Sequence, residues 1–130
     1  CSVDEKRTDF HSAKFGISGL DLFLPLIINK LYHEEKIALF DIFKLITVNP
    51  RNVFNLPPAK LSLNNPATFT IIDLNKEMKI KAENILSAGK NTPFIGTTLK
   101  GFSTATVANG KLINNILPSG LPDFNPGTNN

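Results

Sequence analysis

Hydrophobic residues recur at helical spacing in the first half of the chain. One apolar stripe follows Ser18 and consists of Leu20, Phe23, Leu24, Ile27, Ile28 and Leu31. This spacing is typical of a helix with one buried face. Ser18 and Asp21 have the spacing of a capping box, and Pro25 removes one backbone donor inside the run. We therefore predict a first helix that begins at Ser18, is kinked at Pro25 and ends in the polar run 32–36.

A second apolar stripe predicts a helix over residues 38–48. Its shared face consists of Leu39, Ile42, Phe43 and Ile46. Asn49 is a good N-cap and Pro50 a good first helical residue, so we predict a separate short turn over 50–54. The paired prolines at 57 and 58 end the helical part.

Apolar and polar residues alternate in the second half, as in half-buried strands. Strands are predicted over 68–74, 78–81 (an edge strand), 102–108 and 111–113. The intervening stretch 83–97 contains Gly89, Pro93 and Gly96 and is predicted to be a loop. Asn109-Gly110 between two alternating runs predicts a two-residue hairpin. The proline-containing segment 114–130 is predicted to be an irregular tail.

This order of elements indicates an α+β protein with an incomplete sheet. Three or four strands form a small sheet that needs helices or further strands to cover it. The sequence also begins with Cys1 instead of Met, and no secretory signal precedes the first helix. We therefore expect this chain to be a truncated or processed piece of a longer protein.

Composition excludes several classes of protein. The 130 residues are 42% hydrophobic and 19% charged, which suits one folded domain. One cysteine and two histidines exclude a disulfide framework and a histidine-rich metal centre. No apolar run approaches the roughly 20 residues of a membrane span. The net charge of +3 comes from dispersed lysines after Arg51, which indicates a solvated surface more than a nucleic-acid stripe.

Known catalytic motifs are absent from the sequence. It contains no HExxH, CxxC, P-loop, GxGxxG or GxSxG pattern. A dyad of Cys1 with His11 or His33 is conceivable, but a terminal cysteine without a scaffold is a poor nucleophile. His33 adjoins Glu34 and Glu35 and is predicted to be solvated. The residues alone therefore indicate an α+β piece without a stated activity.

Three stretches, taken in order, carry a resemblance to a known family. They are residues 4–6 with 13–21 (DEK, AKFGISGLD), residues 45–54 (LITVNPRNVF), and residues 90–96 with 99–101 and 107–111 (KNTPFIG, LKG, VANGK). Over residues 1–113 the chain resembles the C-terminal third of bacterial dihydroorotases. These are the class I type of the amidohydrolase superfamily, and the family includes close non-catalytic relatives.

The resemblance implies an architecture. It suggests an α+β fragment that contains the last helices of a TIM-type (β/α)8 barrel, followed by the C-terminal half of a small β-sandwich. Residues 1–56 would form the end of the barrel, with an active-site loop and two helices. Residues 57–113 would belong to the sandwich, and 114–130 to the tail. Active sites of such barrels lie in the loops after the strands.

The resemblance also implies a reaction in the cytoplasm. It is the metal-dependent, reversible ring opening of dihydroorotate to carbamoyl-aspartate in de novo pyrimidine synthesis. By the resemblance, the zinc ligands lie upstream of Cys1, so this segment would hold no metal ligand or catalytic residue and would be incompetent alone. Phe15 and Gly16 match a family pair whose backbone touches the pyrimidine ring. Glycine allows such an approach, although it can also serve the turn alone.

Two departures from the family pattern leave alternatives open. Cys1 falls where active members have a substrate-binding histidine, and Thr68 falls where they usually have aspartate. A thiol cannot replace an imidazolium at a carboxylate. The chain could thus be part of a catalytically silent relative that assembles with aspartate carbamoyltransferase. In either case we expect a small-molecule substrate site, a missing N-terminal barrel, and no nucleic-acid or membrane partner. An unrelated α+β binding module with a basic C-terminal half is the third hypothesis.

Overall fold

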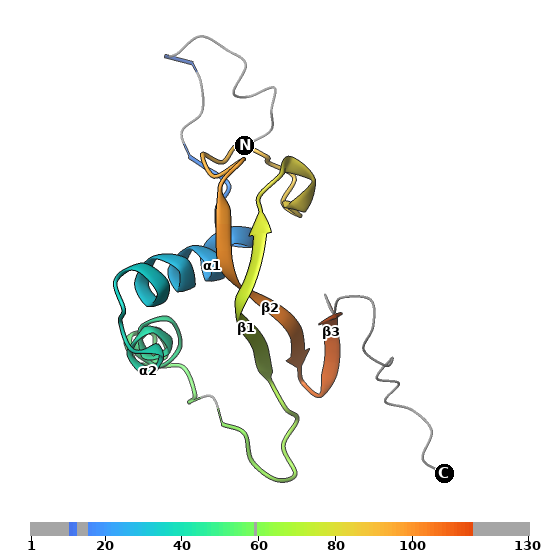
Figure 1. The fold of residues 1–130 in the computed structure, drawn as a ribbon. Coiled ribbons are helices and arrows are strands. Elements are labelled where there is room, and N and C mark those ends of the chain that lie inside the picture. The colour runs from blue at the N-terminus through green and yellow to red at the C-terminus, as the bar shows by residue number, and fades with distance from the viewer. Residues whose placement is uncertain (1–10, 13–15, 59, 116–130) are drawn as a thin grey trace. The chain divides into compact units, whose positions relative to one another are not determined.

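The computed structural model describes residues 11–12, 16–58 and 60–115, and it is an α+β arrangement of two helical segments and a three-stranded sheet (Figure 1). The chain divides into two compact units. Unit 1 comprises residues Cys1–Ala59 and Asp73–Phe102, and unit 2 comprises Lys60–Ile72 and Ser103–Asn130. The α+β class predicted from the sequence is confirmed at this level.

The first helical segment runs without a break through three elements. They are the 3-10 helix η2 (Leu20–Leu22), α1 (Phe23–Ile27) and the π-helix η3 (Ile28–Glu34). Pro25 is buried in the first turn of α1, where its missing N–H is tolerated. The helical segment therefore continues through Pro25, and the predicted kink there stays a prediction. None of the described helices combines the length and apolar character needed to cross a membrane.

The predicted capping box at the start of this segment is also wrong. Gly19 occupies the cap position of η2 and makes no side-chain cap hydrogen bond. The Asp21 carboxylate instead accepts hydrogen bonds from the backbone N–H and the hydroxyl of Ser87, at 3.1 and 2.6 Å. A partner 66 positions away thus replaces the local one.

The second helical segment is continuous as well. It comprises α2 (Leu39–Phe43), the π-helix η4 (Lys44–Val48) and α3 (Asn49–Val53). Asn49 is helical, with φ −62° and ψ −46°, so the predicted N-cap between two helices is wrong. The segment ends where Asn55 adopts the left-handed region at φ 52° and Leu56 N–H donates to Arg51 O at 2.8 Å. Such a left-handed residue is a common helix stop.

The sheet consists of β1 (Phe69–Lys79), β2 (Thr98–Ala108) and β3 (Lys111–Asn115), in the order β1-β2-β3. β1 is one strand of eleven residues, so the predicted break between residues 74 and 78 is wrong. From Ile71 onward its burial alternates without interruption, because the half-buried Lys76 continues the face of Leu74 and Met78. β2 begins four residues before the predicted start, and β3 continues two residues past the predicted end. A short 3-10 helix, η5 (Ala82–Asn84), overlaps the start of the predicted loop 83–97.

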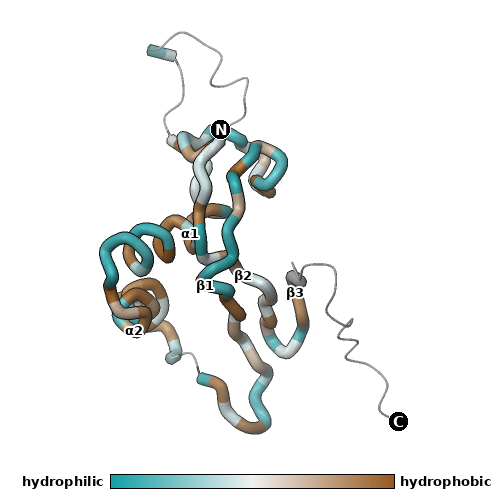
Figure 2. The backbone as a smooth tube through the Cα atoms, viewed as in Figure 1, coloured by the Kyte–Doolittle hydropathy of each residue, from teal (hydrophilic) through white to brown (hydrophobic). Residues whose placement is uncertain are grey.

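Unit 1 holds a hydrophobic cluster that joins the first helical segment to the strands. Its buried members are Leu22, Ile80, Leu99 and Phe102, with Leu26, Met78 and Phe94 packed against them. In Figure 2, hydrophobic residues recur along α1 and α2. Gly101 of β2 lies so close to η3 that an added Cβ would be 2.2 Å from Ile28 Cγ2. This close approach explains the glycine at that position.

Unit 2 contains the hairpin predicted at Asn109-Gly110. β2 and β3 are antiparallel, with Ala108 opposite Lys111 and one irregularity between Thr106 and Val107. Asn109 and Gly110 have φ values of 50° and 75°, as a type I′ turn requires. Gly110 N–H also donates to Ala67 O at 2.8 Å. The hairpin prediction is confirmed.

Candidate functional site

Gly16 is the one predicted substrate-binding residue among the described residues. Its φ is 112°, a conformation that L-residues with side chains rarely adopt. A Cβ added at Gly16 would meet no heavy atom within 4 Å. The glycine is therefore required by the backbone conformation, while its α-carbon faces open space. The other two predicted residues, Cys1 and Phe15, lie outside the described residues.

Asn91 forms hydrogen bonds with the backbone of Gly16 and of Ser18. Its side-chain amide donates a hydrogen bond from Nδ2 to Gly16 O at 2.8 Å. Its backbone carbonyl accepts a hydrogen bond from Ser18 N–H at 2.7 Å. One residue thus engages the backbone on both sides of Ile17. The described part of one stretch that carried the family resemblance, residues 16–21, is thus a neighbour in space of another, residues 90–96.

A hollow of about 180 Å³ lies at this junction and is lined by Gly16, Ile17, Ser18 and Asn91. This volume is below the roughly 300–1,000 Å³ typical of sites for drug-sized ligands. This volume fits a small molecule. Alternatively, the hollow forms one wall of a larger site that other residues complete. The hollow offers backbone groups, the Ser18 hydroxyl and the Asn91 amide to a ligand, and its lining residues include no carboxylate, imidazole or thiol.

The Asn91 segment is anchored to the rest of unit 1. The Asp21 carboxylate binds Ser87, and the ammonium group of Lys90 donates to Ile85 O. Thr92 N–H donates to Lys90 O at 3.0 Å. The Thr92 hydroxyl is buried and has no hydrogen-bond partner among the residues that the structure describes. Residues 85–92 therefore form an irregular but bonded segment that carries Asn91.

Asn91 belongs to the family-like stretch KNTPFIG, but no role was predicted for it from the sequence. A signal was present, because asparagine in a turn-rich segment combines a short donor and acceptor with tolerance of irregular backbone. The spacing could not identify Gly16 as its partner, because the two residues are 75 positions apart. Only the packing in unit 1 brings them together.

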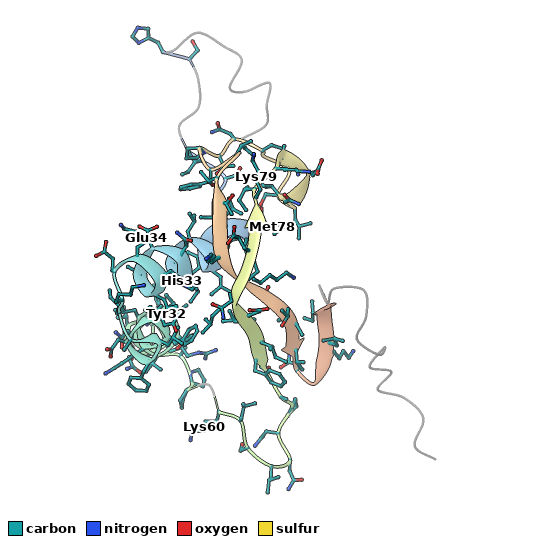
Figure 3. All side chains as sticks on the ribbon, in the orientation of Figure 1. Tyr32, His33, Glu34, Lys60, Met78 and Lys79 are labelled. Carbon is teal, nitrogen blue, oxygen red and sulfur yellow. The ribbon has the colours of Figure 1, made fainter. Side chains whose placement is uncertain are left out.

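His33 makes a tertiary hydrogen bond, so its prediction as a solvated histidine is wrong. It lies on η3 (Figure 3), and its Nε2 is 2.7 Å from Leu74 O of β1. The side chain is partly buried, and its ring packs edge-on against Tyr32 with centroids 4.9 Å apart. Cys1, the other member of the conceivable dyad, lies outside the described residues. His33 therefore serves as a tie between helix and strand.

The neighbouring charges form a solvated ion-pair cluster. Lys30 Nζ is 2.9 Å from carboxylate oxygens of both Glu34 and Glu35. Hydrogen bonds to Glu35 and then Glu34 raise the pKa of Lys30 above its ordinary value. The same contact with Lys30 lowers the pKa of Glu35. All three side chains are exposed, as expected for a surface network without a ligand role.

No group of three or more His, Cys, Asp and Glu side chains converges within the described ranges 11–12, 16–58 and 60–115. The described residues therefore do not fit a metal centre. The dispersed lysines include two exposed ion pairs, Lys81 with Glu83 and Lys100 with Glu77, at 3.3 and 3.4 Å. These pairs reduce the free positive charge on the C-terminal half of the chain.

Comparisons with known proteins give a consistent family. The chain is 39% identical over 109 residues to the dihydroorotase of Geobacillus sp. (strain WCH70), and equally to that of Bacillus subtilis (strain 168). The dihydroorotase of a Wolbachia from Brugia malayi is 39% identical over 108 residues. These alignments cover 83–84% of this chain but only 24–26% of each relative. The chain thus spans about a quarter of the length of the curated relatives it matches.

Solved structures support the fold. An L-hydantoinase (dihydropyrimidinase) from Arthrobacter aurescens matches with a TM-score of 0.72 over 81% of this chain and 24% of its own. A D-hydantoinase matches with a TM-score of 0.74 over 88% of this chain and 25% of its own. Both are 24% identical in sequence, so the likeness concerns the fold alone. No protein-family model matches the chain.

Proposed function

Because this chain is a homologue of bacterial dihydroorotases along most of its length, we propose that it forms the C-terminal part of a dihydroorotase-type cyclic amidohydrolase. The proposed reaction of the whole protein is the reversible ring opening of dihydroorotate to carbamoyl-aspartate, in de novo pyrimidine synthesis. The single observation that carries this proposal is the 39% identity to relatives that bear this enzyme name. The homology also argues against an unrelated binding module.

The proposed architecture follows the same relationship. Residues 1–56 form the last helices of a TIM-type barrel and its active-site loop, and 57–113 belong to a β-sandwich. Residues 114–130 form the tail, although β3 extends the ordered sheet to Asn115. The succession of two helical segments and a small sheet supports this division, as does the likeness to parts of two hydantoinases.

The metal of the proposed reaction, zinc by the family resemblance, does not fit the described residues, which offer no ligand set. As the family resemblance implies, we place its ligands upstream of Cys1. The net reaction adds one water across a ring amide. An oxygen joins the carbonyl carbon, the C–N bond opens, and the nitrogen takes a proton. The described residues contribute binding and positioning to this reaction.

Phe15 and Gly16 are the proposed substrate contacts. The open space at Gly16 supports a close approach of the ring to the backbone, because no Cβ intervenes. The adjoining hollow of about 180 Å³ supports a ligand of small size. We propose that Cys1 occupies the position of the family's substrate-binding histidine.

The silent alternative receives no support from Thr68. Its hydroxyl accepts a hydrogen bond from Asn109 N–H at 3.0 Å and thereby supports the hairpin turn. An aspartate oxygen could accept the same bond, so the departure from the family pattern preserves a structural role. The proposed partners are the substrate dihydroorotate and the N-terminal barrel of the dihydroorotase. Cytoplasmic location and assembly with aspartate carbamoyltransferase rest on the family resemblance.

The direct test is turnover of dihydroorotate by the full-length protein, measured with and without added zinc. We expect metal-dependent formation of carbamoyl-aspartate. Gly16→Ala should raise KM about tenfold, because alanine resists the positive φ by about 1–2 kcal/mol. Gly19→Ala is the matched control, since Gly19 has φ −138° and open space around its α-carbon. A folded, zinc-loaded protein without turnover would contradict the proposal and favour the silent relative.

A further inference from the structure

We propose that Asn91 is a positioning residue for the substrate loop, acting through the backbone of Gly16. This inference rests on the proposed function, in which the Gly16 backbone contacts the dihydroorotate ring. It adds a residue from a separate part of the chain, 75 positions away, whose side chain holds that backbone in place. Asn91 itself requires no contact with the reacting atoms.

Two hydrogen bonds allow Asn91 to fix the backbone conformation of the short segment from Gly16 to Ser18. Its Nδ2 donates to Gly16 O at 2.8 Å, and its own carbonyl accepts from Ser18 N–H at 2.7 Å. These two bonds lie on either side of Ile17. Rotation about the Gly16 torsions moves its carbonyl away from Nδ2, so the loop cannot reorient without breaking this bond.

Glycine makes such a bond necessary. A glycine samples positive and negative φ almost equally and loses more freedom on ordering than any other residue. The open space around Gly16 means that no packing contact at its α-carbon selects the observed φ of 112°. The bond from Asn91 is a contact that can select it. A preorganised loop then binds substrate without first being ordered.

The support beneath Asn91 is suited to this role. Thr92 N–H donates to Lys90 O, and the Lys90 ammonium group donates to Ile85 O. The Asp21 carboxylate holds Ser87 through two hydrogen bonds, which ties the same segment to η2. Asn91 therefore belongs to a segment held by several hydrogen bonds, and it supplies the side-chain bond that fixes the Gly16 carbonyl.

The side-chain chemistry defines the variants. Alanine at position 91 removes the donor to Gly16 O but keeps the backbone acceptor for Ser18. Glutamine keeps an amide donor on a chain one methylene longer. Asn65→Ala is the matched control, because it also removes an exposed side-chain amide donor, which bonds to Ser62 Oγ, without touching Gly16 or the segment that carries Asn91.

The test is steady-state kinetics of these variants in the full-length protein with dihydroorotate as substrate. Asn91→Ala should raise KM about tenfold and leave kcat within about twofold, as expected for loss of one exposed hydrogen bond that preorganises binding. Asn91→Gln should recover part of the loss, and Asn65→Ala should leave KM within about twofold. An unchanged KM for Asn91→Ala, or an equal rise for Asn65→Ala, would overturn the proposal.

A double-mutant cycle shows whether Asn91 acts through Gly16. In the Gly16→Ala background the added effect of Asn91→Ala should nearly vanish, because the loop geometry is already lost. Independent, multiplying effects would overturn positioning. Hydrogen exchange of the 16–18 amides provides a second readout that needs no turnover. Exchange should quicken in Asn91→Ala, and unchanged exchange would overturn the proposal even in an inactive protein. Absence of turnover in the wild type would refute the proposed function alone.

Discussion

The two compact units of this chain are organised by different interactions. Unit 1 contains all the buried hydrophobic core residues among the described residues, namely Leu22, Ile28, Ile42, Ile80, Ile85, Leu99 and Phe102. It is also held by side chains that bond to residues 41 to 75 positions away. The described part of unit 2 has no fully buried hydrophobic side chain, and a two-residue hairpin organises its strands.

This difference indicates which unit can hold a ligand-binding segment in a fixed position. The proposed substrate contact at Gly16 requires a rigid support, and unit 1 supplies packing and long-range hydrogen bonds around Gly16 and Asn91. Unit 2 relies on backbone pairing that the local sequence already favours. Equivalent changes in the two units should therefore have unequal consequences. Two pairs of variants test this directly, and two further predictions concern smaller effects within unit 1.

The largest expected effect is that of Gly101→Ala in unit 1. A Cβ there would lie 2.2 Å from Ile28 Cγ2, and the φ of 90° is unfavourable for alanine. Overpacking and backbone strain together should lower the free energy of unfolding by about 3–5 kcal/mol. Gly110→Ala in unit 2 has φ 75° with open space, so the loss should be about 1 kcal/mol. Urea unfolding of the full-length protein measures both. Equal losses would contradict the distinction between the units.

The next effect concerns side chains that accept backbone hydrogen bonds. Asp21→Ala leaves two partly buried Ser87 donors without their acceptor and should lower the free energy of unfolding by about 1–3 kcal/mol. Thr68→Val in unit 2 removes the acceptor of the exposed Asn109 N–H, which water can replace. Its loss should be below about 1 kcal/mol. Faster hydrogen exchange at Ser87 in Asp21→Ala would locate the damage. Unaltered exchange there would show that this contact contributes little.

His33 should contribute a smaller amount. His33→Phe keeps an aromatic ring but removes the bond to Leu74 O, so we expect a loss of about 1 kcal/mol. His33→Gln retains a donor at similar reach and should restore part of it. Urea unfolding of the two variants gives the comparison. If both variants lost the same free energy, ring packing against Tyr32 would explain the effect instead of the hydrogen bond.

The smallest effect belongs to the exposed ion pairs of Lys30. The pKa of Glu35 is lowered from 4.5, so its stabilising contribution is present above that pH and is lost as pH falls through the folded-state value. The pKa of Lys30 is raised above 10.5, so its contribution is complete below that pH and disappears at more alkaline pH. Lys30→Gln should slightly flatten the acid side of the Tm–pH curve. High salt should abolish this difference, and a salt-resistant difference would indicate a less solvated pair.

Sequence patterns predicted the elements better than their ends. The apolar stripes correctly indicated two helical segments, and alternation indicated strands. Asn109-Gly110 identified the hairpin, because a type I′ turn depends on the φ preferences of those two residues. Asn49-Pro50 failed as a helix boundary, because the same residues fit inside a helix whose preceding turn already exists. Local sequence preferences therefore specify which conformations a residue can adopt. They do not decide between a helix boundary and a continuous helix when the two have similar free energies.

The candidate site was predicted only in part. Gly16 was singled out through a family resemblance, whereas its partner Asn91 had no assigned role. Asp21 has the spacing of a local capping residue, yet its carboxylate binds Ser87. A polar side chain near a helix end has several possible partners of similar strength. Packing decides among them, since it determines which partner arrives within hydrogen-bond distance.

The sequence by itself determined the α+β order of elements, the hairpin at Asn109-Gly110 and the relationship to dihydroorotases. The order of elements and the hairpin depend on residue types within a few positions of one another. The relationship depends on stretches of sequence that can be compared directly with those of relatives. Only the tertiary structure decided that Asn91 holds Gly16, that His33 binds Leu74 and that Ile28 packs onto Gly101. Each of these contacts joins residues 41 to 75 positions apart, so it exists only once helices and strands have packed together.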